Sequence, residues 1–228
     1  MMEHGTVTAL EVQKRNKKRV SVFLDGEYAF SLSLDDAARL RKGQVLTEAE
    51  ITALRDHDAV TRASDAAARF LGLRPRSVHE VRQNLAAKDL PPGVIDQAVE
   101  HLTQLGYLDD RSFAAFWVAD RAQFKPLSPR ALRYELRRKG IADAIIDEVL
   151  ADLDAEDAAY RAASSQLRRL RGLDHRTFRE KIGVFLARRG FSYAMSRETI
   201  RRLIETLEEE DPEFFASDTE SQDQYEQE

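Results

Sequence analysis

The apolar positions of this chain follow two different periods, and the change between them falls near residue 35. Before it, three short runs of apolar and β-branched residues are separated by polar segments, a pattern that predicts β-strands. Asp25-Gly26 lies between the second and third runs, and this dipeptide favours a type I′ hairpin turn. We therefore expect a small three-stranded β-meander. Its predicted strands are Thr6–Val12, Val20–Leu24 and Tyr28–Leu32.

After residue 35 the apolar residues recur every three or four positions, which predicts helices that bury one face. A Thr47-Glu48-Ala49-Glu50 capping box predicts the start of a long helix that ends near Leu71. Three later helices each carry two apolar residues four positions apart. These pairs are Val81 and Leu85, Leu132 and Leu136, and Ile182 and Leu186. A further helix follows each of them, with buried positions expected at Ile95, Val99 and Leu102, at Ile146, Leu150 and Leu153, and at Ile200, Ile204 and Leu207.

One short block, Leu-x-x-(Lys/Arg)-(Gly/Asp)-apolar, occurs three times, at residues 85–90, 136–141 and 186–191. A spacing near 50 residues in a helical chain indicates tandem repeats. We therefore predict a mainly α fold: a tandem array of three three-helix repeats, preceded by a small N-terminal β-meander and followed by a disordered acidic tail. The predicted segments are residues 1–46 for the meander with a short helix, 47–109, 110–154 and 155–209 for the repeats, and 210–228 for the tail.

The flanks of these helices are also patterned. Ser77 and Ser128 follow matching basic-Pro-x motifs, so each is expected to cap the helix after it. The first helix of each repeat aligns poorly and is placed by length at residues 62–71, 110–122 and 156–170. Phe113, Phe116 and Trp117 on the second of these are expected in the core rather than as a platform for stacking bases.

Composition narrows the class of protein. The 228 residues include no cysteine, which excludes disulfides and thiolate chemistry. The N-terminus lacks a signal-peptide pattern, and no apolar run approaches the roughly 20 residues that span a bilayer. We expect a soluble cytoplasmic protein.

The net charge of −5 hides an uneven distribution. Residues 205–228 hold eleven acidic groups and no Lys or Arg, so the rest of the chain has 35 basic against 29 acidic residues. Between Arg161 and Arg202 there are twelve Lys or Arg and three acids. Such a density of cations favours contact with a polyanion or an acidic protein surface.

The candidate contact residues are basic positions in the second and third repeats, because the first copy of the block is nearly neutral around Lys88. A cation before the final glycine is also typical of an ordinary helix end, so this alternative stays open for the block itself. The candidates are Arg130, Arg133, Arg137, Arg138, Lys139, Arg168, Arg169, Arg171, Arg188, Arg189, Arg201 and Arg202. Secondary candidates in the basic turn between the first two strands are Lys14, Arg15, Lys17 and Lys18, with Arg19 beside them.

Signals for catalysis are weak. The chain has no phosphate-binding glycine loop, nucleophile elbow or zinc-type His pair. Asp56-His57-Asp58 is the one local cluster of metal-ligand types, but consecutive helical residues point to different sides. We predict no catalytic, cofactor-binding or metal residues, and no enzyme.

Three motifs resemble the bacterial RecX family of regulatory proteins: residues 106–114 (GYLDDRSFA), 133–141 (RYELRRKGI) and 185–191 (FLARRGF). The resemblance runs from about Arg62 to Leu207. It implies a protein that binds RecA recombinase filaments and inhibits their ATPase, strand-exchange and coprotease activities in DNA repair, homologous recombination and the SOS response. We also expect the protein to be a monomer. It also implies weak, non-specific binding of single- or double-stranded DNA.

Two other classes fit the residues. Short three-helix units with basic helices are also found in DNA-binding transcriptional or architectural proteins. A helical scaffold without nucleic-acid contacts is the second alternative.

Overall fold

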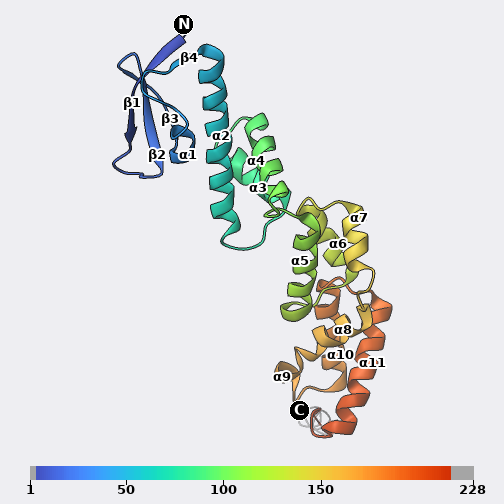
Figure 1. Ribbon diagram of the computed structural model, residues 1–228. Helices are drawn as coiled ribbons and strands as arrows, with labels where there is room; N and C mark the ends of the chain where they lie inside the picture. The colour runs from blue at the N-terminus through green and yellow to red at the C-terminus, as the bar shows by residue number, and fades with distance from the viewer. Residues whose placement is uncertain (1–3, 217–228) are drawn as a thin grey trace, which may run out of the picture. The chain divides into compact units, whose positions relative to one another are not determined.

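The structure is a computed structural model that describes residues 4–216 (Figure 1). It opens with an antiparallel sheet of four strands, not three: β1 (His4–Val12), β2 (Arg19–Leu24), β3 (Glu27–Ser33) and β4 (Val45–Thr47), in the order β3-β2-β1-β4. The added strand β4 pairs with the start of β1. Three residues are too few to show an alternating pattern, which is why the sequence did not reveal β4.

The predicted hairpin turn is confirmed. Asp25 and Gly26 both have positive φ, 50° and 90°, and Leu24 pairs with Glu27 across a two-residue loop. This is the backbone that a type I′ turn requires.

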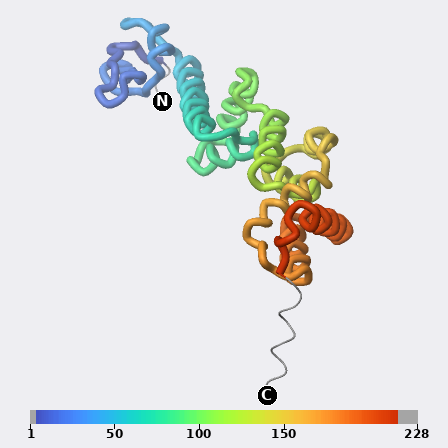
Figure 2. The backbone as a smooth tube through the Cα atoms, turned by 90° about the horizontal axis from the view of Figure 1, so that it is seen from below, coloured from blue at the N-terminus to red at the C-terminus, as the bar shows by residue number. Residues whose placement is uncertain are grey.

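Four helices belong to the first of two compact units, residues 1–109. They are α1 (Leu34–Ala37), α2 (Glu48–Leu71), α3 (Val78–Ala86) and α4 (Pro92–Gln104). Figure 2 shows α2 as one unbroken helix. Its first turns pack Ile51 and Leu54 against the sheet, and its last turns bury Ala63 and Ala67 with α3 and α4. The predicted capping box at its start is present, with Thr47 and Glu50 bonded in both directions.

The second unit, residues 110–228, holds the other helices of the described chain. They are α5 (Asp110–Phe124), α6 (Pro129–Arg138), α7 (Asp143–Leu150), α8 (Ala155–Ser164), α9 (Leu167–Leu170), α10 (His175–Arg188) and α11 (Tyr193–Glu210). The single helix predicted over residues 156–170 is wrong, because α8 ends at Ser164 with Ser165 as its C-cap. The Ser165 hydroxyl donates to the Ala162 carbonyl at 2.6 Å, a local bond that competes with helix continuation. No helix within residues 4–216 has the length and apolarity to cross a bilayer.

The predicted apolar positions form the cores. All three pairs four residues apart are buried, each in its own cluster with the helices beside it. The predicted positions of the following helices are also buried, except Leu153, which is partly buried. Of the aromatic residues on α5, Phe113 is buried and Trp117 is partly buried, whereas Phe116 is exposed, contrary to the prediction. Ser77 and Ser128 cap α3 and α6 as predicted.

The repeated block is a helix ending with a defined hydrogen-bond pattern. In the second copy, Gly140 N–H donates to the Arg137 carbonyl at 2.9 Å and Ile141 N–H to the Leu136 carbonyl at 3.1 Å. The third copy repeats this with Gly190 and Phe191, whose N–H bonds Leu186. Both glycines have positive φ, so each block forms a Schellman motif. In both copies a backbone hydrogen bond therefore links the leucine at the start of the block to the apolar residue at its end.

The acidic tail begins differently from the prediction. Residues 211–216, expected to be disordered, pack on the third repeat because two of them are aromatic: Phe214 is buried in its core and Phe215 lies edge-on to Phe178. Backbone bonds from Gly172 N–H to Phe214 and from Ala216 N–H to Leu173 fix this segment. The rest of the predicted tail, residues 217–228, lies outside the described residues.

The second and third repeats meet at Gly190. Ser128 N–H donates to the Arg189 carbonyl at 3.1 Å. A Cβ placed on Gly190 lies 2.6 Å from Ser128 Oγ and 2.9 Å from Ala131 Cβ. Glycine is therefore required here by contact between repeats as well as by its φ of +85°.

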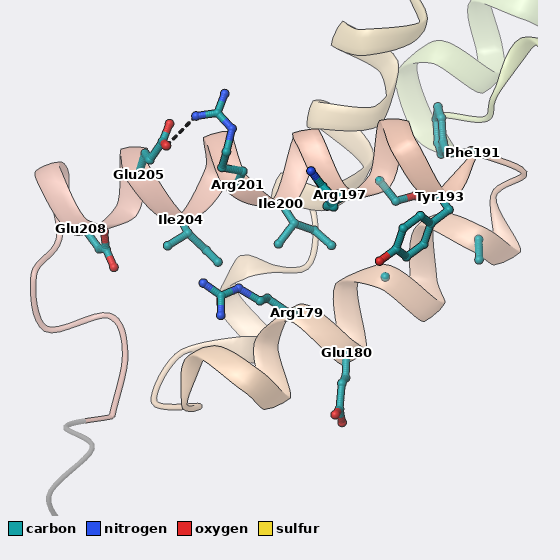
Figure 3. A pocket seen from close by; sticks show the side chains of 13 residues that line it. Arg179, Glu180, Phe191, Tyr193, Arg197, Ile200, Arg201, Ile204, Glu205 and Glu208 are labelled. Atoms are coloured by element: carbon teal, nitrogen blue, oxygen red, sulfur yellow. Dashed lines mark hydrogen bonds and ion pairs between the residues drawn. The ribbon is translucent and has the colours of Figure 1, made fainter.

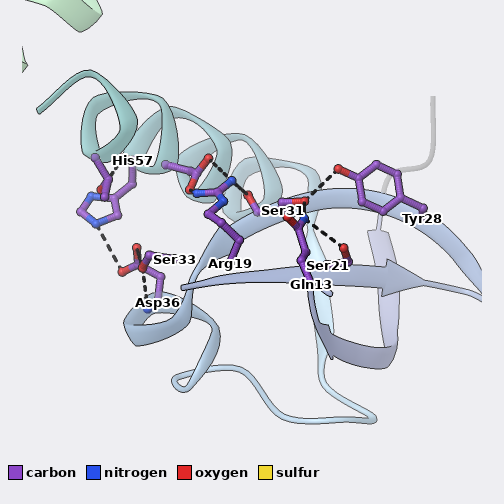
Figure 4. A network of polar contacts seen from close by, with 10 residues as sticks. Gln13, Arg19, Ser21, Tyr28, Ser31, Ser33, Asp36 and His57 are labelled. Carbon is purple, nitrogen blue, oxygen red and sulfur yellow. Dashed lines mark hydrogen bonds and ion pairs between the residues drawn. The ribbon is translucent and has the colours of Figure 1, made fainter. Parts of the chain in front are cut away.

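In the first unit, an ion pair joins the sheet to α2 (Figure 4). Arg19 from β2 pairs with Asp58, whose side chain is 8% exposed, and also donates to the Ser31 carbonyl at 3.1 Å. The bond with Asp58 is the main reason that the pKa of Arg19 is raised. Arg19 was grouped with the exposed cations of the turn, but its role is structural.

We expect Gly190→Ala to destabilise the second unit more than Gly172→Ala. Both glycines have positive φ, near +80°, so both substitutions cost about 1–2 kcal/mol in backbone strain. Only Gly190 adds a clash, which costs about 1–3 kcal/mol more. The single tryptophan, Trp117, lies in this unit, so its fluorescence during urea unfolding reports the loss. Equal losses in the two variants would contradict the packing role of Gly190.

We expect Asp58→Ala to destabilise the sheet, because it leaves the partly buried Arg19 without its acid; the cost should stay below the about 3–5 kcal/mol of a fully buried pair. Asp56→Ala is the control, since Asp56 is exposed on the same helix and such changes cost within about 0.5 kcal/mol. Hydrogen exchange of the β2 and β3 amides measures the effect. Unchanged protection in Asp58→Ala would show that the pair does not hold the sheet on α2.

Candidate nucleic-acid interface

Several candidate arginines are neutralised within their own repeat. Arg133 lies 2.5 Å from Asp147 and Arg137 lies 2.7 Å from Asp143. The bond to Arg137 lowers the pKa of Asp143, and the same bond raises the pKa of Arg137. In the third repeat, Arg171 pairs with Asp211, and Arg201 pairs with both Glu198 and Glu205. These guanidinium groups present little uncompensated charge to a partner.

A second group of cations lies on aromatic rings. Arg138 is 5.9 Å from the centre of the Tyr134 ring, and Arg202 is 4.7 Å from that of Tyr160. Lys139 lies 4.8 Å from the Trp117 ring centre, where Arg121 also stacks and bonds Glu135. Cation–π contact orients these groups while leaving their charge in place.

Arg189 belongs to the junction of the repeats. It is half-buried, it lies over Phe185, and its guanidinium donates to the Pro126 carbonyl at 3.4 Å. Burial lowers its pKa. Its position is explained by packing between the second and third repeats.

Four candidates have neither an ion pair nor an aromatic partner among residues 4–216. All four are exposed. They are Arg130 on α6, Arg168 and Arg169 on α9, and Arg188 at the end of α10. The turn residues Lys14, Arg15, Lys17 and Lys18 are exposed as well and form no ion pair within the described chain.

One of the unpaired arginines, Arg130, lines a hollow, and Arg188 is the sequence neighbour of another lining residue. This hollow, of about 470 Å³, lies where α6 meets the end of α10, and it is lined by Arg130, Ala131, Tyr134, Ala187, Gly190 and Phe191. Arg188 is the next residue after Ala187. Arg130, Tyr134 and Arg138 follow one another at intervals of four residues on α6, so they form a stripe on one face. We call these three residues with Arg188 the α6 stripe.

The stripe combines the groups that bind nucleic-acid strands without reading sequence. Arginine contacts phosphates, and an exposed aromatic ring stacks on a base. Tyr134 is 63% exposed, and it was not among the α5 aromatics weighed above for stacking. The signal was its placement four residues from both Arg130 and Arg138, on the face opposite the buried Leu132 and Leu136.

Four family models match the chain in order. Their descriptions are regulatory protein RecX N-terminal domain over residues 5–47, and RecX first, second and third three-helix domain over residues 63–102, 109–150 and 154–200. The matches follow the sheet and the three helical clusters along the chain.

Curated relatives and solved structures agree with these matches. The chain is 35% identical to a regulatory protein RecX of Lactobacillus delbrueckii over 90% of its own length and 77% of the relative. It is 42% identical to one of Chlorobium phaeobacteroides over 62% and 93% of the two chains. A crystal structure of regulatory protein RecX superposes with a TM-score of 0.68 at 27% identity, covering 87% of this chain and 99% of that one. Because family models, relatives and structure coincide over most of the chain, it belongs to the RecX family of regulatory proteins.

Proposed function

We propose that this protein binds RecA nucleoprotein filaments and inhibits their recombinase, ATPase and coprotease activities. The observation that carries the proposal is the run of four RecX family models along one chain. The protein acts as a monomer, and its three repeats, residues 47–109, 110–154 and 155–209, supply several weak contacts that together raise avidity.

The charge distribution supports a contact centred on the second and third repeats. The α6 stripe and the α9 pair Arg168 and Arg169 hold cations without carboxylate partners in the described chain, whereas Arg133, Arg137, Arg171 and Arg201 are paired. A filament on DNA offers both phosphates and protein carboxylates as partners. Weak, non-specific DNA binding follows from the same groups, because phosphate contact carries no sequence information.

The function is tested by RecA's DNA-dependent ATPase with and without the protein. We expect inhibition at fewer than one protein per RecA protomer, because a bound regulator blocks a filament rather than a single subunit. An unchanged ATPase rate at equimolar protein would contradict the proposal. A transcriptional or architectural protein would instead prefer one operator-like duplex over random duplex by roughly 10³ or more.

We expect the double variant Arg130→Gln/Arg188→Gln to bind single-stranded DNA more weakly and with less salt dependence. Each phosphate contact contributes about 0.7 to the slope of log affinity against log salt on single strands, so the slope should fall by about 1.4. Fluorescence anisotropy at several salt concentrations measures both quantities. The same variant should need several-fold more protein to inhibit the RecA ATPase.

The matched control is Arg161→Gln/Arg176→Gln. It removes the same charge from exposed arginines of the second unit, but each is paired with an acid on its own helix, Asp157 and Glu180. Little change is expected in this control. If the two double variants weaken binding equally, net charge and not the α6 stripe determines affinity.

A further inference from the structure

A long groove runs along the third repeat between α10 and α11 (Figure 3). Its volume is about 870 Å³. Ile200 and Ile204 point from α11 toward α10, with Phe191 at one end. Gly183 keeps the α10 side open, since a Cβ there would meet only Ile200, at 3.9 Å. The floor of the groove is therefore apolar, with Ile200 8% and Ile204 6% exposed.

Two arginines on the rim have no acid partner among residues 4–216. Three acids also line the groove: Glu180 pairs with Arg176, Glu205 shares Arg201 with Glu198, and Glu208 contacts His175. Arg179 and Arg197 line the same groove and form no ion pair among residues 4–216. An occupant that combines an apolar side chain with carboxylates matches this lining.

The last described residues lead to one end of this groove. Ala216 N–H bonds the Leu173 carbonyl at 3.2 Å, and Phe215 stacks on His175 with ring centres 4.1 Å apart. The same His175 contacts Glu208 of the rim at 2.9 Å. The chain therefore leaves the described structure beside the Glu208 end of the groove.

Residues 217–228 have the matching chemistry. They hold five acids, no Lys or Arg, and one aromatic residue, Tyr225. The nine residues from Ala216 to Tyr225 reach at most about 30 Å when extended. The rim from Glu208 to Tyr193 on α11 spans about 23 Å at 1.5 Å per residue, so Tyr225 can reach any part of the floor.

We propose that the C-terminal segment 217–228 binds in cis in the α10–α11 groove, with the Tyr225 ring on the apolar floor and the flanking carboxylates on Arg179 and Arg197. Attachment to the same chain gives this segment a local concentration in the millimolar range. Weak contacts are therefore enough to occupy the groove. The proposal concerns the third repeat alone and does not depend on the proposed function.

The absence of cysteine makes a single spin label simple to place in the full chain. We expect a nitroxide on Glu228→Cys to broaden the Ile200 and Ile204 methyl signals at least twofold relative to the reduced label. Adding Tyr225→Ala, or Arg179→Glu with Arg197→Glu, should restore the signals. Gly183→Leu should restore them as well, because leucine is a good helix former and its side chain fills the floor.

The control is Arg168→Glu with Arg169→Glu, which makes the same charge change on α9 outside the groove lining and should leave the broadening in place. Two outcomes overturn the proposal. The first is full intensity of the Ile200 and Ile204 signals with the label present. The second is broadening that appears only when spin-labelled chains are mixed with isotope-labelled chains, since the segment then occupies the groove of a second copy.

Discussion

The second helix of each repeat ends at a residue with a left-handed backbone conformation, and the rest of the helical fold depends on the turn made there. It turns the chain so that the next helix returns across the buried leucine of the block, and the bond from Ile141 or Phe191 back to that leucine closes the turn. A helix end of this kind leaves few free carbonyl groups. In the third repeat the same residue also sets the distance to the second repeat, because the Ser128 hydroxyl occupies the space where a side chain would project.

The residue at this position has two roles that the sequence alone does not distinguish. It adopts a positive φ, and in the third copy it also contacts another repeat. Asp89 ends the first copy with φ of 57°, which is possible because Asp adopts the left-handed region at a modest cost. Gly190 has no such alternative, since any Cβ meets α6. The repeats are alike in backbone, and in the third copy of the block the glycine is also needed for contact with another repeat.

Periodicity and local motifs predicted features that involve residues near in sequence, and these were confirmed: the three apolar pairs four residues apart, the caps at Ser77 and Ser128, and the Asp25-Gly26 hairpin. They missed what depends on partners distant in sequence. The strand β4 is defined by pairing with β1, and residues 211–216 are held by Phe178 and the loop before α10. The prediction of a basic surface was also incomplete, because a count of charges does not show which arginines face an acid.

Pairing changes the meaning of the charge excess in the third repeat. Arg171 and Arg201 raised the count of cations there, yet each lies beside the carboxylates of Asp211 or of Glu198 and Glu205. An arginine in such a pair must release its acid before it can hold a phosphate, which costs about 0–1 kcal/mol for an exposed pair. Arg130 and Arg188 have no acid partner to release within the described chain. The proposed contact at the junction of the second and third repeats therefore rests on the distribution of free charge and not on its total.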